Sequence, residues 1–251
     1  MCTVIVLRRP GHPWPLILGA NRDEMILRRA RPPARHWPDR PEVVAGLDEL
    51  AQGSWLGLND HGVTAGLLNR FGTLGPAAGR RSRGELVLEA LDHADAAEGA
   101  AALAAIDPGA YRPFNLIIAD NRDAFWLRHA DATGRAPVTA QRLPAGISMI
   151  AAGDLDEHET PRLRRYRPRF AAAPPPDPER DDWAAWEGLL SESETTAQDG
   201  PTGAMRFLTE RGFGTVSSAI IALPAMGAGR KPVFRFRTWL PEPSPWHDVA
   251  A

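Results

Sequence analysis

Short apolar runs bounded by turn-forming residues mark both ends of the chain. Near the start, TVIVLRR (3–9) and PLILGAN (15–21) flank the turn-forming stretch PGHPWP. Runs of β-branched and apolar residues bounded by Gly and Pro predict strands, and the short connection predicts that these two pair as a hairpin. Two similar runs, 215–223 and 233–240, predict strands near the other end.

The middle of the chain combines further hairpins with helical segments. Paired strands are expected within 53–72 and 114–130, with further strand residues within 141–153. Helices are expected over 86–94, in an Ala-rich stretch that ends before 106, and over 156–170, 181–190 and 203–212. Ser82 with Glu85 forms a capping-box pattern in front of the first of these helices.

Two proline-rich segments interrupt these elements. The segment 29–41 (RARPPARHWPDRP) predicts an irregular excursion, and 171–182 is the most linker-like stretch, although it lies between helices. Strands at both ends with helices between them predict an α+β fold rather than a parallel sheet. We expect a single domain over 1–251, of which 240–251 forms a C-terminal tail.

Composition narrows the class of protein. The chain of 251 residues is 43% hydrophobic and 24% charged, the balance of an ordinary globular protein. The net charge of -2 gives no electrostatic reason to expect a nucleic-acid partner or an anionic membrane surface. No apolar stretch approaches the ~20 residues that span a bilayer. Charged and Pro residues interrupt the first apolar run, so no signal peptide is expected, and the default location is the cytoplasm.

The single cysteine stands directly behind the start methionine. One Cys excludes an internal disulfide framework. Removal of Met1, which we expect because Cys is small, would give Cys2 both a thiol and a free α-amino group. This placement suggests an N-terminal nucleophile. The competing interpretation is a small buried side chain in an edge strand.

The segment Asn21 to Glu24 follows the second apolar run and carries four polar residues. The same tripeptide, Asn-Arg-Asp, recurs at 121–123 between two apolar runs, where a hairpin turn explains it. A turn is also the simplest interpretation of the first copy. If the first two strands pair, however, Arg22 and Asp23 return beside Cys2. An exposed ion pair of these two residues is the structural alternative.

A third polar position, Asn69, ends a predicted strand in the block GSWLGLNDHGVTAGLLNR. Together these features resemble the NRDE family, the transport and Golgi organisation proteins. The resemblance rests on Met-Cys-Thr, on Asn-Arg-Asp-Glu about twenty residues later, and on the blocks GSWLGLNDHGVTAGLLNR, FNLIIAD and GTVSSAIIAL in order. It covers most of the chain. That family is similar in turn to the bile-salt hydrolase and penicillin V acylase branch of the N-terminal-nucleophile hydrolases.

The resemblance implies a four-layer αββα sandwich and a role for each matched residue. Cys2 would attack an amide or ester carbonyl, with its own α-amino group relaying the proton. Arg22 would favour the thiolate, and Asp23 would hold the α-ammonium. Asn69 would donate a hydrogen bond to the oxyanion. No metal is implied, and no His pair has the spacing of metal ligands.

Two departures from the family's pattern weaken the expectation of a fast amidase. Where relatives place a second Asn after a strand, this chain has Ala151 and Ala152, and where relatives often carry Arg it has Val216. Loss of one oxyanion donor costs about 10²–10³ in rate. Gly153 or a backbone N–H is the alternative donor.

Two functions therefore stay open, besides the weaker option of a pure interaction protein. The first is hydrolysis of a C–N bond in a small amide, which needs no cofactor. The second is a non-catalytic carrier of a hydrophobic molecule, with haem or an acyl-lipid as candidates, because eukaryotic members of the family are linked to haem trafficking and lipid homeostasis. The basic run 162–169 predicts a solvated helix face, and Trp183 and Trp186 predict core positions.

Overall fold

The first strands of the chain complete a sheet whose other strands come from its second half. The computed structural model describes residues 2–250. Contacts divide them into two units, one formed by residues up to Arg28 with Pro144–Val249, the other by Arg29–Leu143. All strand pairs are antiparallel. The pairing of strands from distant parts of the sequence within one sheet positions the candidate site.

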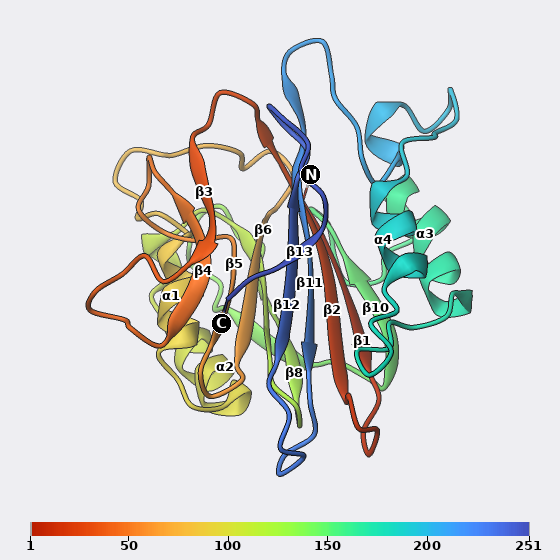
Figure 1. Ribbon diagram of the computed structural model, residues 1–251. Helices are drawn as coiled ribbons and strands as arrows, with labels where there is room; N and C mark the ends of the chain where they lie inside the picture. Colours follow the sequence, from red (N-terminus) through yellow and green to blue (C-terminus); the bar gives the residue numbers. More distant parts are fainter. Residues whose placement is uncertain (1, 251) are drawn as a thin grey trace. The chain divides into compact units, whose positions relative to one another are not determined.

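The first unit contains a six-stranded sheet in the order β10-β1-β2-β11-β12-β13. Its strands are β1 (Thr3–Arg8), β2 (Leu16–Met25), β10 (Gly146–Ile150), β11 (Phe213–Leu223), β12 (Val233–Thr238) and β13 (His247–Asp248). Its helices are α3 (Pro161–Ala172), α4 (Ala184–Ser191) and the short 3₁₀ turn η2 (Pro201–Gly203). Helices α3 and α4 pack beside the strands β10, β1 and β2 (Figure 1).

Apolar side chains between these helices and the sheet form the core of the first unit. Trp186 of α4 is fully buried and meets Phe170 of α3 edge to face, with ring centroids 5.1 Å apart. Gly19 of β2 lets the indole approach, because a Cβ built there would lie 3.2 Å from the Trp186 ring. The core positions predicted for Trp183 and Trp186 are confirmed.

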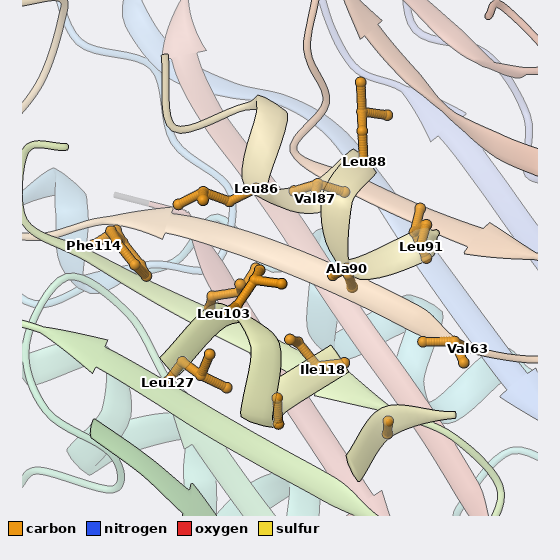
Figure 2. Packing of buried hydrophobic residues seen from close by; sticks show 14 of the residues in the cluster. Val63, Leu86, Val87, Leu88, Ala90, Leu91, Leu103, Phe114, Ile118 and Leu127 are labelled. Atoms are coloured by element: carbon orange, nitrogen blue, oxygen red, sulfur yellow. The ribbon is translucent and has the colours of Figure 1, made fainter. Parts of the chain in front are cut away.

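The second unit contains a seven-stranded sheet in the order β3-β4-β5-β6-β7-β8-β9. Its strands are β3 (Ala30–Ala34), β4 (Val43–Asp48), β5 (Leu56–Asn59), β6 (Thr64–Asn69), β7 (Phe114–Ala119), β8 (Ala124–His129) and β9 (Thr139–Arg142). Its helices are α1 (Glu85–Leu91), α2 (Ala96–Ala104) and η1 (Pro108–Ala110). Figure 2 shows side chains of α1 and α2, such as Leu86 and Leu103, near Phe114 and Ile118 of β7.

Two predicted elements differ from the structure, and strand β4 was not predicted. The segment 203–212 is not the expected helix, because the Phe207 carbonyl accepts from the Thr215 N–H at 2.8 Å, so its backbone pairs with β11 instead. The segment 29–41, expected to be irregular, contains β3 at the edge of its sheet. The two prolines of β3 fall where the register shifts between Arg31 and Ala34, a place where a strand tolerates them. Strand β4 has no counterpart among the predicted elements.

The predicted capping box of the first helix is wrong. Gly84 occupies the N-cap of α1 without a side-chain cap, and Ser82 Oγ accepts from the Gly84 N–H at 3.3 Å. Gly53 packs against Gly84 so closely that a Cβ on Gly53 would lie 2.5 Å from the Gly84 carbonyl carbon. Close contact between two backbones, rather than a side-chain cap, therefore fixes the start of this helix.

Candidate functional site

Most of the polar residues that the sequence singled out lie at one end of the central strands of the first unit's sheet. Antiparallel pairing brings the start of β1 beside the end of β2, and Thr3 lies directly opposite Asn21. The start of β11 follows on the other side of β2, with Thr215 opposite Asp23. Cys2 immediately precedes β1, so the structure brings Cys2, Arg22 and Asp23 together at this end of the central strands.

The Cys2 thiol lies against the backbone of β2. Its Sγ is partly buried and donates a hydrogen bond to the Asp23 carbonyl oxygen at 3.6 Å. Burial raises the pKa of this thiol, and the Asp23 charge raises it further, whereas the Arg22 charge lowers the pKa without offsetting them. In the chain that retains Met1, loss of solvent thus outweighs the nearby cation and the thiol pKa is raised. The lowered pKa expected for a chain that begins at Cys2 stays a prediction.

The Asp23 carboxylate is held by a buried guanidinium. Arg162 Nη1 lies 2.8 Å from Asp23 Oδ2, and neither side chain has any solvent exposure. The Thr215 hydroxyl donates to Asp23 Oδ1 at 2.8 Å, and the same Arg162 nitrogen donates to Thr3 Oγ1 at 2.8 Å. A charge removed from water is tolerated when it is paired and hydrogen-bonded in this way.

Arg162 is the residue of this site that sequence reasoning missed. The basic run 162–169 was expected to form a solvated helix face, yet Arg162 is completely buried. Helical spacing held the signal, because Arg162, Tyr166 and Phe170 follow one another at intervals of four and all face the core. A basic residue on the apolar stripe of a helix predicts a buried anionic partner, which here is Asp23.

Val216 marks another departure from regular pairing. It lies at a β-bulge of β11, between Thr215, which faces Asp23, and Ser217, which faces Arg22. Its side chain is apolar and 8% exposed, so it brings no charge to the site. The guanidinium beside Asp23 comes from helix α3 instead.

Asn21 fastens β2 to the segments around α4. Its Nδ2 donates to the carbonyl oxygens of Leu190 at 3.0 Å and Met205 at 2.8 Å. Its Oδ1 accepts from the Ser218 hydroxyl at 2.6 Å, and Trp239 Nε1 donates to that hydroxyl oxygen at 2.7 Å. Asn21 is 1% exposed and is structural by these contacts.

The second Asn-Arg-Asp copy has a different environment. It lies in the turn between β7 and β8, where Asp120 Oδ1 accepts from the backbone N–H groups of Arg122 and Asp123, both at 2.7 Å. Asp123 is also paired with the exposed side chain of Arg142. The predicted hairpin turn is confirmed, whereas the first copy continues β2 as strand instead of turning.

Asn69 is the last residue of β6 in the second unit, opposite Phe114 of β7. Its side chain is partly buried. The proposed oxyanion role of Asn69 stays a prediction, since this residue and Cys2 belong to different units.

The loop after β10 carries the positions where relatives place a second Asn. Ala151 and Ala152 are buried and offer no side-chain donor. Gly153 packs against the Glu157 carboxylate, because a Cβ on Gly153 would lie 1.7 Å from Glu157 Oε1. Backbone groups are thus the donors that this loop can supply.

The described residues contain neither a cluster of metal-ligating side chains nor a helix suited to span a membrane. Within 2–250, no group of three or more His, Cys, Asp and Glu side chains is placed to hold a metal ion. Among the helices of the same residues, none has the length and apolar character needed to cross a bilayer.

Known structures show what fold the chain shares. The N-acylethanolamine-hydrolyzing acid amidase ortholog of Caenorhabditis elegans matches with a TM-score of 0.56 and 14% identity, over 90% of this chain and 95% of that chain. Two mutant forms of the conjugated bile acid hydrolase from Clostridium perfringens match with TM-scores of 0.52 and 0.54 and identities of 11% and 12%, each over 99% of this chain and 92% of that chain. The expected α+β fold of the N-terminal-nucleophile hydrolase type is confirmed.

Sequence comparison with curated proteins gives no match. The profile of the family described as Transport and Golgi organisation 2 matches residues 1–225, most of the chain. This match agrees with the resemblance stated from Cys2, Arg22 and Asp23. The chain is a member of the Transport and Golgi organisation 2 family.

Proposed function

We propose that the chain is a cysteine hydrolase that cleaves the C–N bond of a small amide. The observation that carries the proposal is the convergence of Cys2, Arg22 and Asp23 at one end of the central strands. The fold shared with two kinds of amidase supports it. The names of those neighbours make N-acylethanolamines and conjugated bile acids the first amides to test.

The proposed reaction begins with loss of Met1, which lies outside the described residues. The free α-amino group of Cys2, with an ordinary pKa of about 7.7–8.0, accepts the thiol proton. The thiolate forms a C–S bond to the amide carbonyl carbon, the α-ammonium returns its proton to the leaving nitrogen, and the C–N bond breaks as the amine departs. Water then hydrolyses the thioester, which releases a carboxylic acid and restores the thiol.

The buried pair beneath Cys2 has a positioning role in this scheme. The Asp23 charge raises the pKa of the Cys2 thiol, and Arg162 pairs with that carboxylate at 2.8 Å. Arg162 thus limits the effect of Asp23 on the thiol, while Arg22 favours the thiolate. Asn69 is the proposed oxyanion donor. Without an Asn at Ala151 or Ala152, we expect turnover about 10²–10³ slower than with two donors.

The raised pKa of the Cys2 thiol fits a requirement for processing. A protonated thiol is a poor nucleophile, so the chain that retains Met1 should be inactive. Removal of Met1 places the α-amino group within the same residue as the thiol, where it can act as the base.

The first test is the intact mass of the purified protein, followed by a screen of N-acylethanolamines and conjugated bile acids. We expect the mature chain to begin at Cys2, and Cys2→Ser to abolish turnover, with far-UV circular dichroism unchanged. Arg122→Gln, in the second copy of the motif, is the matched control and should retain wild-type turnover. A mature chain that keeps Met1, or turnover that survives in Cys2→Ser, would rule the mechanism out.

A carrier of a hydrophobic ligand is the second candidate, because apolar side chains are exposed at the same end of the central strands. Met25, Ile26 and Leu208 are 37%, 42% and 53% exposed. Met25 pairs with Phe213, and Leu208 bridges to Gly214, so these segments adjoin at the start of β11. An acyl chain or haem is the proposed ligand.

The same variant separates the two candidates. A carrier forms no covalent bond to an acyl-lipid, so Cys2→Ser should bind a fluorescent fatty acid within a few fold of wild type. With haem, the thiolate is a possible axial ligand, and Cys2→Ser should shift the visible spectrum of the complex. If neither the fluorescent fatty acid nor haem binds the wild-type protein, the carrier is excluded.

A further inference from the structure

Two arginines lie against one tryptophan on the helix-covered face of the first unit's sheet. The Arg237 guanidinium carbon is 3.5 Å from the centroid of the Trp239 ring, and that of Arg206 is 4.8 Å from the same ring. Trp246 also lies near Arg237, at 5.9 Å. We refer to Arg206, Arg237 and Trp239 as the Arg–Trp cluster.

The Arg–Trp cluster is separate from the proposed nucleophile. Arg237 lies directly opposite Ser218, which in turn lies opposite Asn21, so these three side chains share one face of the sheet. Arg22 is the next residue along β2, and alternation along a strand turns its side chain to the other face. An occupant of the cluster therefore does not compete with a substrate at Cys2, and the inference is independent of the proposed hydrolase.

Neither guanidinium group of the Arg–Trp cluster is in an ion pair with a carboxylate of the described residues. Among residues 2–250, neither Arg206 nor Arg237 forms an ion pair, and Arg237 Nε is buried without a hydrogen-bond acceptor. Arg235, two positions earlier on β12, pairs with Glu187 at 3.1 Å, Asp181 at 3.3 Å and Asp248 at 3.1 Å. Carboxylates thus form ion pairs with Arg235, whereas Glu187 acts on Arg237 only through its charge, without an ion pair.

An arginine in this position is electrostatically unfavourable by itself. Burial lowers the pKa of Arg237, the Glu187 carboxylate raises it, and the Arg206 charge lowers it again. A buried guanidinium N–H without an acceptor carries the full cost of its desolvation. Stacking on Trp239 offsets part of this cost but supplies no hydrogen-bond acceptor.

We propose that the Arg–Trp cluster is a binding site for the oxyanion group of a small molecule, a carboxylate or a phosphate. Two guanidinium groups offer forked N–H donors whose geometry matches such a group. The ring of Trp239 provides an apolar surface beside it. Arg206 donates through Nε to the Ser191 carbonyl at 3.1 Å, which fixes its stem. The Trp239 ring is fixed by its hydrogen bond to Ser218.

The test measures binding of inorganic phosphate and of acetate at constant ionic strength, by thermal unfolding and by tryptophan fluorescence. An anion that binds only the native state raises Tm, by an amount that grows with the logarithm of its concentration relative to Kd. We expect wild type to bind at least one of these anions with Kd of about 1 mM or tighter. Arg237→Met and Arg206→Met should each weaken binding about tenfold or more, the loss of a charge-assisted contact. Arg211→Met, which removes an exposed charge, should bind within twofold of wild type.

Stability without the anion distinguishes a binding site from a structural cation–π stack. If the cluster is an anion site, Arg237→Met removes a buried N–H that has no acceptor, so Tm in anion-free buffer should stay equal to wild type or rise. If the stack only stabilises the fold, that Tm should fall and phosphate should have no effect. Failure of both anions to bind wild type, or unchanged binding in both Arg→Met variants, would overturn the proposal.

Discussion

A single buried carboxylate determines much of the environment of Cys2. Asp23 raises the pKa of the thiol through its charge, and its carbonyl oxygen accepts the thiol hydrogen bond. Arg22 acts in the opposite direction from the same strand. Two adjacent residues of one tripeptide therefore shift the pKa of the thiol in opposite directions. Burial has the largest effect and makes the net shift upward.

This balance predicts the pH dependence of alkylation at Cys2 in the chain that retains Met1. The rate with iodoacetamide should rise with a midpoint above the ordinary thiol pKa of about 8.5, and Arg22→Gln should move the midpoint higher still. Because the folded-state pKa is raised, the neutral thiol favours folding below that ordinary value, and this contribution is lost as pH rises through the folded-state pKa. Arg122→Gln, in the exposed copy of the motif, should leave the midpoint unchanged. A midpoint below 8.5, on the order of the free amino group's pKa, would contradict this reading.

At the scale of elements, the same three residue types serve two purposes. In β2 they continue a central strand and contact α3 and β11, whereas between β7 and β8 they form a turn. Tertiary neighbours decide the difference. The first copy meets Arg162, Thr215 and Ser218 from distant parts of the chain, and the second is held by the adjacent Asp120.

The two aspartates of these copies should differ strongly in their effect on stability. Asp23→Asn leaves Arg162 as a buried charge without its carboxylate, which costs about 3–5 kcal/mol of the free energy of unfolding. Asp123→Asn breaks a pair with the exposed Arg142 and should cost about 0–1 kcal/mol. Urea unfolding of both variants measures the difference. Equal losses would show that the Asp23–Arg162 pair is not the structural element described above.

At the scale of the whole molecule, the first unit is discontinuous in sequence. Strands β1 and β2 belong to its first 28 residues and lie in the sheet order between β10 and β11, which belong to 144–249. Folding of this unit therefore requires closure of a long loop of chain before its central strands can pair. The other unit consists almost entirely of the continuous segment Arg29–Leu143.

A fragment of residues 144–249 should not fold alone. It lacks the two strands between β10 and β11, so the faces of α3 and α4 that pack on β1 and β2 would be exposed to water. Circular dichroism and the dispersion of amide resonances in an NMR spectrum measure this, with the full chain as control. A dispersed spectrum from the isolated fragment would show that β1 and β2 are dispensable for this unit.

The sequence by itself determined the local features of this protein. Apolar runs with short connections predicted the hairpins at 3–21 and 114–130, and helical spacing predicted most of α3 and α4. The order of Cys2, Asn-Arg-Asp-Glu and the later blocks predicted the family and the fold class. These features depend on residues close together in the chain, or on blocks in a fixed order, so they are readable without coordinates.

Only the tertiary structure decided the environments of the site residues. Which copy of Asn-Arg-Asp is buried, why 203–212 pairs with β11 instead of forming a helix, and the sign of the Cys2 pKa shift all depend on segments far away in sequence. Arg162 is 139 positions from its partner Asp23, and no local pattern connects the two. Burial and pairing of charge arise when the sheet assembles, because desolvation is a property of the packed environment and not of the residue.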